Sequence, residues 1–380
     1  MTVLGIIDKQ SNMSITIEEF GTPSKSKTNT SGFNFSRKNR IVPWVEKYRP
    51  KKLKDVVHQP DVIRVLKNSI KTGNLPHLLF HGPPGTGKTS TILALARELF
   101  GPKLLKKRVF ELNASSQRGI NFVREDIFNF ATSAVGAVDP RFPCPPYKIV
   151  ILDEVDAMTK EAQSALRKIM EDASHITRFM FICNYINKII DPIVSRCTKF
   201  RFKPLPSTTS FRRLQYISHR ETMILKPSVY ATIIKVSGGD MRKAIMLLQN
   251  ISYTYKYTPL INDAHVYELA NWIPPKYMND MLEDCLTTSK PSVIWARDQT
   301  RDIRRNGFPV QQLMEQLLEV VVESARLTDI QKATVGINIA GIEKRLNDAA
   351  DEYLQLMAIF TVLRSTIQGK TTVPRALHIM

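Results

Sequence analysis

Eight consecutive residues, from Gly82 to Thr89, read Gly-Pro-Pro-Gly-Thr-Gly-Lys-Thr. This run matches G-x-x-x-x-G-K-[ST], in which the backbone N–H groups of a glycine-rich loop surround phosphates. In such a loop Lys88 binds the β- and γ-phosphates of a nucleotide and the Thr89 hydroxyl ligates Mg²⁺. The pattern therefore predicts a site for ATP and Mg²⁺. Its expected nucleotide contacts are the loop and the residue after it, Gly82, Pro83, Pro84, Gly85, Thr86, Gly87, Lys88, Thr89 and Ser90.

Two carboxylates close an apolar run further along the chain. Residues 148–152 are Lys-Ile-Val-Ile-Leu, and Asp153 and Glu154 follow directly. Ligands gather at the carboxyl ends of parallel strands, so both side chains are expected at the phosphate site. Asp153 suits Mg²⁺, directly or through water, and Glu154 is placed to orient and deprotonate an attacking water. A buried strand ending in acids is common, but after a phosphate-binding loop it favours an ATPase over a passive nucleotide binder.

Two polar residues are weaker candidates. Asn184 follows the apolar run 179–183 and is able to bond a γ-phosphate or the water, although a turn residue at a strand end explains it equally well. Arg242 falls in the first turn of a helix for which Asp240 is the expected N-cap. A lone arginine on a helix is usually solvated, so spacing alone does not assign it.

The elements that must hold these residues are readable from the sequence. Residues 77–81 form a short apolar run of strand length, and residues 90–100 have helical apolar spacing. Gly101 and Pro102 then predict the end of that helix. From Val42 to about Pro206 strands alternate with helices, which is typical of an α/β domain, and later patterns are helical. We expect a flexible extension at 1–40, an ATP-binding domain at 41–206, a small helical domain at 207–270 and a C-terminal helical domain at 271–380.

The charge of the chain indicates a polyanionic partner. Its 380 residues hold 54 Lys and Arg against 35 Asp and Glu, a net charge of +19. Residues 1–40 contribute only +3 of this, so the folded part is itself basic. Nucleic acid is the simplest such partner, although a basic protein without a specific partner has the same composition.

Other sequence features point to an intracellular location. No run of 18 apolar residues predicts a membrane span, and no signal-peptide pattern opens the chain. The four cysteines are widely spaced and contain no C-x-x-C pair. We therefore expect reduced thiols and no zinc site. No membrane partner is therefore predicted.

Several further motifs resemble the boxes of the replication factor C small subunits, the AAA+ clamp loaders of eukaryotes and archaea. They occur in the family's order over roughly residues 42–365. The matching runs are Val42-Pro-Trp-Val-Glu-Lys-Tyr-Arg-Pro50, Gly73-Asn-Leu-Pro-His-Leu-Leu-Phe80, Glu111-Leu-Asn-Ala-Ser115, Ser195-Arg-Cys197 and Gly239-Asp-Met-Arg242. Cys144-Pro-Pro-Tyr-Lys148 is most similar to the fourth eukaryotic subunit type. The resemblance implies an AAA+ P-loop domain with a parallel sheet, a helical lid and an all-helical collar that joins five subunits in a ring.

The resemblance also implies roles for matching positions. The box from Val42 to Pro50 would lie near adenine, with Tyr48 and Arg49 flanking the base. Asn184 matches the first sensor of the γ-phosphate and Arg242 the second, on the lid.

Further roles are implied outside the nucleotide box. Arg196 matches an arginine inserted into the neighbouring subunit's ATP site, where it stabilises transition-state charge. Asn113 resembles a residue that holds the catalytic glutamate inactive until DNA arrives. Gln163 would link its helix to the ATP site. The chain departs from the family at Ser116-Gln117, where two acids are typical, and at Val155 within the acidic run.

The expected DNA contacts are on two helices. Arg118 lies beside the start of a helix capped by Ser115 and Ser116, where backbone N–H groups favour phosphate. The helix from Thr159 to about Glu171 has an apolar face and an opposite face that carries Arg167 and Lys168. Periodicity alone favours a solvated face. The resemblance instead implies a surface that follows the DNA backbone without reading its sequence.

We therefore expect an ATPase subunit that helps open a sliding clamp, similar to proliferating cell nuclear antigen, and load it onto primer–template DNA in replication. One alternative is a structural subunit of the loader that binds nucleotide but hydrolyses little. Another is a different AAA+ ATPase that remodels DNA. The location would be nuclear for a cellular eukaryotic protein, or the site of viral DNA replication for one encoded by a large DNA virus.

Overall fold

The computed structural model describes residues 42–56, 59–115, 123–136, 138–255 and 260–369, and the structural statements below concern these residues. All helices and strands described belong to one compact unit, Pro43–Met380. The expected extension at 1–40 lies outside the described residues.

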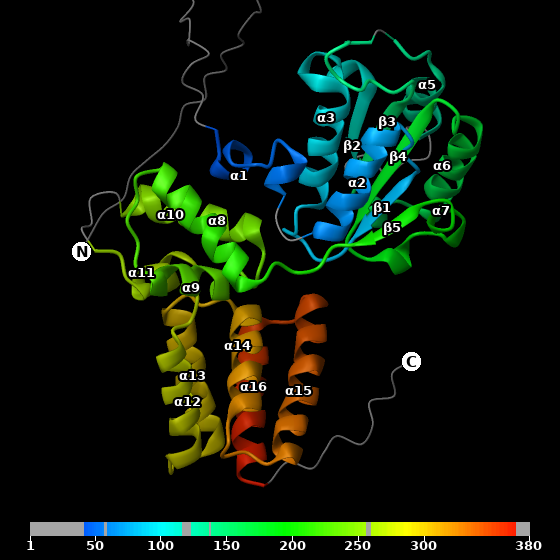
Figure 1. The fold of residues 1–380 in the computed structure, drawn as a ribbon. Helices are drawn as coiled ribbons and strands as arrows, with labels where there is room; N and C mark the ends of the chain where they lie inside the picture. Colours follow the sequence, from blue (N-terminus) through cyan, green and yellow to red (C-terminus); the bar gives the residue numbers. More distant parts are fainter. Residues whose placement is uncertain (1–41, 57–58, 116–122, 137, 256–259, 370–380) are drawn as a thin grey trace, which may run out of the picture. The chain divides into compact units, whose positions relative to one another are not determined.

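A five-stranded sheet forms the centre of the N-terminal half (Figure 1). The strands are β1 (Leu78–His81), β2 (Val109–Asn113), β3 (Lys148–Asp153), β4 (Thr177–Cys183) and β5 (Thr198–Arg201). Their order is β2-β3-β4-β1-β5, and every neighbouring pair is parallel. Because β4 lies between β1 and β3, the segments that follow these three strands leave the sheet side by side.

Helices cover both faces of this sheet (Figure 1). One face packs against α2 (Pro60–Thr72) and α3 (Lys88–Arg108). The other packs against α5 (Phe128–Thr132), α6 (Lys160–Asp172) and α7 (Asp191–Val194). The short turns of helix are η2 (Leu53–Asp55), η3 (Val123–Ile127), η4 (Val155–Ala157) and η5 (Ile186–Lys188).

Burial on both faces explains the uninterrupted apolar runs of the central strands. In β3, Ile149 and Ile151 point to the core under α2 and α3, whereas Val150 and Leu152 point to the core under α6. A strand that is buried on both faces has no polar face to alternate with its apolar one. The strands predicted at 148–152 and 179–183 are thus confirmed.

Helix α3 differs from the expectation at its C-terminal end. Gly101 has φ 64° and ψ 172°, so the helix breaks there as predicted. The prediction that the helix stops at this point is wrong, because helical turns resume at Pro102 and continue to Arg108. Proline is tolerated in the first turn of this second segment, where its missing N–H has no helical acceptor.

The remaining helices form two separate apolar cores. The first contains α8 (Ser207–Arg220), α9 (Pro227–Val236), α10 (Met241–Thr254) and α11 (Asp263–Leu269). The second contains α12 (Pro275–Thr287), α13 (Ser292–Arg305), α14 (Val310–Glu323), α15 (Asp329–Asn347) and α16 (Glu352–Ile367). This arrangement confirms the expected fold class, a parallel α/β domain followed by helices alone. The exact domain boundaries remain predictions.

The short helix α1 (Trp44–Lys47) belongs to the first of these helical cores. Trp44 is buried together with residues of α8, α9 and α10, although the chain continues from α1 directly into the α/β part. The Trp44 backbone N–H also donates to Gln249 Oε1 at 2.9 Å. Trp44, Val45 and Tyr48 therefore pack on the helical core that follows the sheet in sequence.

Candidate nucleotide-binding site

The glycine-rich loop connects β1 to α3, as the sequence predicts. Lys88 begins α3, and its Nζ donates to the carbonyl oxygens of Gly82 at 2.7 Å and Pro83 at 2.9 Å. Asn184, at the end of β4, accepts a third bond from Lys88 Nζ at 3.0 Å. Burial lowers the pKa of Lys88, and Arg242 adds to this shift while Asp153 opposes it. A buried ammonium stabilised largely by carbonyl dipoles is suited to a polyanionic ligand.

The two expected magnesium ligands meet at the same place. The Thr89 hydroxyl donates to Asp153 Oδ2 at 2.7 Å, which brings together the first turn of α3 and the end of β3. A hydroxyl and a carboxylate are hard oxygen donors of the kind that Mg²⁺ prefers beside nucleotide phosphates. The residues present therefore fit the ion.

Glu154 occupies a backbone conformation that few side-chain-bearing residues adopt. Its φ is 58° and ψ is 40°, and its side chain is exposed on the lining of a cavity beside the loop. Its backbone N–H donates to Asp153 Oδ1 at 2.9 Å. Left-handed residues of this kind cost about 1–3 kcal/mol and concentrate at functional sites. The turn directs Glu154 away from the buried strand and toward the cavity.

Asp156 holds the neighbouring strand end in place. Its Oδ2 accepts from the backbone N–H groups of Asn184 and Tyr185, both at 3.3 Å. The end of β4 is thus bonded to the turn after β3. Asp156 was not among the predicted site residues, although its position in the acidic run was a signal.

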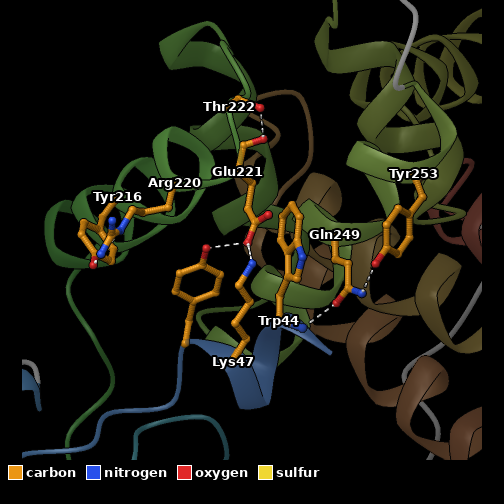
Figure 2. Close-up of polar contacts among 9 residues, drawn as sticks. Trp44, Lys47, Tyr216, Arg220, Glu221, Thr222, Gln249 and Tyr253 are labelled. Carbon is orange, nitrogen blue, oxygen red and sulfur yellow. Dashed lines mark hydrogen bonds and ion pairs between the residues drawn. The ribbon is translucent and has the colours of Figure 1, made fainter. Parts of the chain in front are cut away.

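Tyr48 and Arg49 lie where the loop approaches the helical core. Arg49 Nε donates to Ser90 Oγ at 3.3 Å, next to the glycine-rich loop. The Tyr48 hydroxyl donates to Oε1 of Glu221, the residue after α8. Lys47 Nζ donates to the same oxygen (Figure 2). Burial acts to raise the pKa of Glu221, but the hydrogen bonds from Lys47 and Tyr48 outweigh it and lower the pKa.

A cavity of about 380 Å³ opens between these groups. Its lining includes Tyr48 and Arg49 from the N-terminal box, Asp153 and Glu154 from the end of β3, and Arg242 from α10. Gly85, Thr86, Gly87 and Ser90 line it as well. Thr89 is joined to this lining by its bond to Asp153, whereas Lys88 and Asn184 bond to each other and are not among the lining residues. Gly82, Pro83 and Pro84 complete the loop.

Helix α10 approaches the loop closely. Asp240 caps α10 by accepting from the Arg242 backbone N–H at 2.7 Å, which confirms the predicted N-cap. Gly85 has φ +72°, and a Cβ there would lie 2.0 Å from Asp240 Oδ1. Only glycine fits this approach, which brings the exposed Arg242 to the cavity.

Several other predicted residues that the structure describes are not on the lining of this cavity. Val42 is exposed and is not among the lining residues, and Arg118 lies outside the described residues. Arg196 follows α7 and bonds Glu171 and the Pro192 carbonyl rather than the loop. Arg167 and Lys168 are both on the exposed face of α6, as the periodicity predicts.

Two residues with roles implied by the resemblance have well-defined partners. Asn113 lines the cavity, and its Oδ1 accepts from the backbone N–H and hydroxyl of Ser115 at 2.9 and 2.7 Å. Gln163 is fully buried, and its amide bonds Met158 O, Lys188 O and the Ile190 N–H. It thereby connects α6 to the segments that follow β3 and β4.

Sequence reasoning missed the residues that act through long-range contacts. Glu221 reaches Tyr48 across 173 positions, and Arg213 donates to the Tyr48 carbonyl across 165. No spacing pattern signals such pairs.

Within the described part of the chain, no group of three or more His, Cys, Asp or Glu could hold a metal ion by itself.

All four cysteines are buried free thiols: Cys144, Cys183, Cys197 and Cys285. Burial raises the pKa of Cys197 to about 12, which disfavours a reactive thiolate there. None of the described helices is both long enough and apolar enough to cross a membrane.

Comparison with known proteins identifies two family regions. Residues 78–205 match the ATPase family associated with various cellular activities (AAA). Residues 273–361 match the replication factor C C-terminal domain. The first region contains the glycine-rich loop and Asp153, and the second contains most of the last five helices.

Individual relatives extend over nearly the whole chain. Replication factor C subunit 2 of rice, Oryza sativa, is 45% identical, over 88% of this chain and 97% of the relative. Human replication factor C subunit 4 is 46% identical, over 90% of this chain and 92% of the relative. A putative replication factor C small subunit of Acanthamoeba polyphaga mimivirus is 40% identical, over 83% of this chain and 94% of the relative. The rice subunit 2 and the human subunit 4 are thus similar to this chain to nearly the same degree.

Among solved structures, the RuvB Holliday junction branch migration motor of Thermotoga maritima aligns with a TM-score of 0.47. It is 17% identical and covers 63% of this chain and 80% of that chain. The sequence relatives are decisive, because they share more than two fifths of their residues with this chain across almost its full length. The chain is an AAA+ ATPase that belongs to the replication factor C small-subunit family.

Proposed function

We propose that this chain is an ATP-hydrolysing subunit of a five-subunit clamp loader, in which it assembles with other replication factor C subunits. The complex would open a ring-shaped sliding clamp, similar to proliferating cell nuclear antigen, and place it on primer–template DNA. The observation that carries the proposal is the convergence of Lys88, Asn184 and the Thr89–Asp153 pair at the ends of β1, β4 and β3. These groups are suited to bind ATP and Mg²⁺, and Glu154 lies next to Asp153 on the cavity lining.

The bound nucleotide would be held from three directions. The loop and Lys88 hold its phosphates, Tyr48 and Arg49 contact the base end, and Arg242 on α10 reaches the γ-phosphate. Thr89 and Asp153 would hold Mg²⁺, which neutralises phosphate charge when bound. The lowered pKa of Lys88 supports this role, because a polyanion supplies the countercharge that the buried ammonium lacks.

Glu154 is the proposed general base. Its exposed carboxylate on the cavity lining is able to accept a proton from an attacking water, and Asn184 is placed to orient that water or sense the γ-phosphate. Asn113 lines the same cavity, which supports its proposed control of Glu154. Asp156 would keep Asn184 in position through the backbone bonds described above.

Arg196 would act on the neighbouring subunit. It bonds Glu171 and Pro192 on its own chain, and it is not among the residues that line this chain's cavity. An arginine supplied from outside a site stabilises transition-state charge and raises the rate by about 10³–10⁵-fold. Arg118, Arg167 and Lys168 would contact the DNA backbone, in keeping with the basic charge of the folded part.

The relatives include cellular eukaryotic and viral proteins, so both origins are consistent with the family. We place the protein inside the cell, in the nucleus if its origin is cellular.

A site-by-site assay in the assembled complex tests the proposal. Glu154→Gln should retain ATP binding but lose hydrolysis at this chain's own site, because an amide cannot accept the water's proton. Arg196→Ala should instead impair hydrolysis at the adjacent subunit's site and spare this one. Persistent turnover of the Glu154→Gln site would refute the base assignment. If a complex with only this chain's site intact hydrolyses no ATP even without substitutions, the structural-subunit alternative is favoured.

A further inference from the structure

Two arginines that the proposed function assigns to different ligands meet on one carboxylate oxygen. Arg167 Nε donates to Glu171 Oε1 at 3.0 Å, and Arg196 Nη2 donates to the same oxygen at 2.5 Å. Arg167 is one helical turn before Glu171 on α6, whereas Arg196 reaches it from the segment after α7. The three side chains are 38% to 44% exposed, so phosphates have access to both guanidinium groups.

Arg196 is held at two points. Besides the bond to Glu171, its Nη1 donates to the Pro192 carbonyl at 2.8 Å. A guanidinium has five N–H donors in a rigid plane, so two fixed points orient the plane while other donors remain for a ligand. Of the two groups that hold Arg196, the Glu171 carboxylate is charged and the Pro192 carbonyl is neutral.

We propose that Glu171 is a positioning residue that links the DNA-facing Arg167 to the arginine presented to the adjacent subunit. This inference rests on the roles proposed above for Arg167 and Arg196. In the absence of DNA the two arginines share Oε1, and each weakens the other's bond. When a DNA phosphate takes Arg167, Oε1 is left to Arg196 alone, and the support of Arg196 becomes stronger. DNA binding at Arg167 would thus change how firmly Arg196 is held at the subunit interface, through the Glu171 carboxylate.

The charge of Glu171 is consistent with this arrangement. The hydrogen bond from Arg167 is the largest cause that lowers its pKa, and Arg196 contributes in the same direction. The carboxylate is therefore ionised at neutral pH and attracts both guanidinium groups. A surface ion pair without a linking role would have a small effect and would not couple DNA affinity to turnover at the adjacent site.

The test is Glu171→Gln in the complex assembled with its partner subunits. The amide keeps the shape but loses the charge that restrains Arg167. We expect affinity for primer–template DNA to rise by about two- to fivefold, the size of an exposed ion pair. DNA-stimulated turnover at the adjacent subunit's site should fall by about the same factor, because Arg196 loses its charged support. Opposite changes in these two assays distinguish coupling from damage to the fold, which lowers both.

Two controls make the result specific. Glu161→Gln removes the same charge from an exposed position on α6, so it measures the general electrostatic effect on DNA affinity. In an Arg167→Ala background, Glu171→Gln should no longer raise DNA affinity. The proposal is overturned if Glu171→Gln behaves like Glu161→Gln, or if DNA affinity and turnover fall together.

Failure of the underlying roles is recognised separately. If Arg196→Ala leaves the adjacent site unchanged, or Arg167→Ala leaves DNA affinity unchanged, the role of that arginine is wrong and the linkage fails with it. If both single variants behave as expected and Glu171→Gln has no effect, the linkage alone is wrong.

Discussion

Replacing Gly85 with alanine is expected to separate the phosphate-binding loop from the start of helix α10. The new Cβ would lie 2.0 Å from Asp240 Oδ1 and 2.9 Å from the Met241 backbone N. That same Oδ1 accepts the Arg242 N–H at 2.7 Å and caps α10. Since the loop backbone and the helix backbone meet here, Asp240 must move and give up its cap.

The free-energy cost of Gly85→Ala has two parts, backbone strain at position 85 and loss of the Asp240 cap. Alanine at φ +72° costs about 1–2 kcal/mol in backbone strain. Loss of an aspartate N-cap costs about 0.5–2 kcal/mol more. Gly73 offers a matched control, because its φ is +67° and a Cβ there would meet nothing within 4 Å. Gly73→Ala should therefore incur only the first cost.

Hydrogen exchange of the first turn of α10, measured by mass spectrometry without nucleotide, is the appropriate assay. Loss of the cap should speed local exchange by about 2- to 30-fold in Gly85→Ala and leave it unchanged in Gly73→Ala. Asp240→Ala should speed exchange in the same turn to a similar extent. The double variant Gly85→Ala/Asp240→Ala should exchange at nearly the same rate as Asp240→Ala alone. Equal exchange in Gly85→Ala and Gly73→Ala would refute the close approach of loop and helix.

Two further predictions follow from other contacts. Burial, helped by Arg178, lowers the pKa of His77 to about 4, so the unfolded chain binds more protons than the folded one between about pH 6.5 and 4. Stability should fall as the pH drops through this window, and His77→Asn, chosen to keep an acceptor for the Phe179 N–H, should remove that part of the pH dependence in urea unfolding. An unchanged pH profile would mean that His77 is not buried neutral. Glu221→Ala should weaken ATP binding by up to about tenfold, since a bond to a charged group contributes roughly 1.5 kcal/mol, yet leave binding of inorganic tripolyphosphate unchanged. Equal losses for the two ligands would show that Glu221 does not act through Tyr48.

The sequence alone predicted the parts of the site that are built from neighbouring residues. The glycine-rich loop, the two acids at the end of β3 and the Asp240 cap each lie within a run of a few residues. Backbone geometry relates such residues directly, so their types and spacing are informative. The apolar runs of β3 and β4 and the amphipathic face of α6 were predictable for the same reason, because burial imposes a pattern on consecutive positions.

The tertiary structure decided what brings distant segments together. Spacing left Asn184 equally open to a turn or a site, and only the position of β4 between β1 and β3 puts it on Lys88. Three contacts have no local signal in the sequence: the packing of Trp44 with α10, the bond from Tyr48 to Glu221, and the bond from Arg196 to Glu171. Helix α3 continues past Gly101 although glycine and proline together predict a stop. The contacts of Asn184, Trp44, Tyr48 and Arg196 join residues far apart in the chain, and short-range sequence patterns carry no information about such contacts.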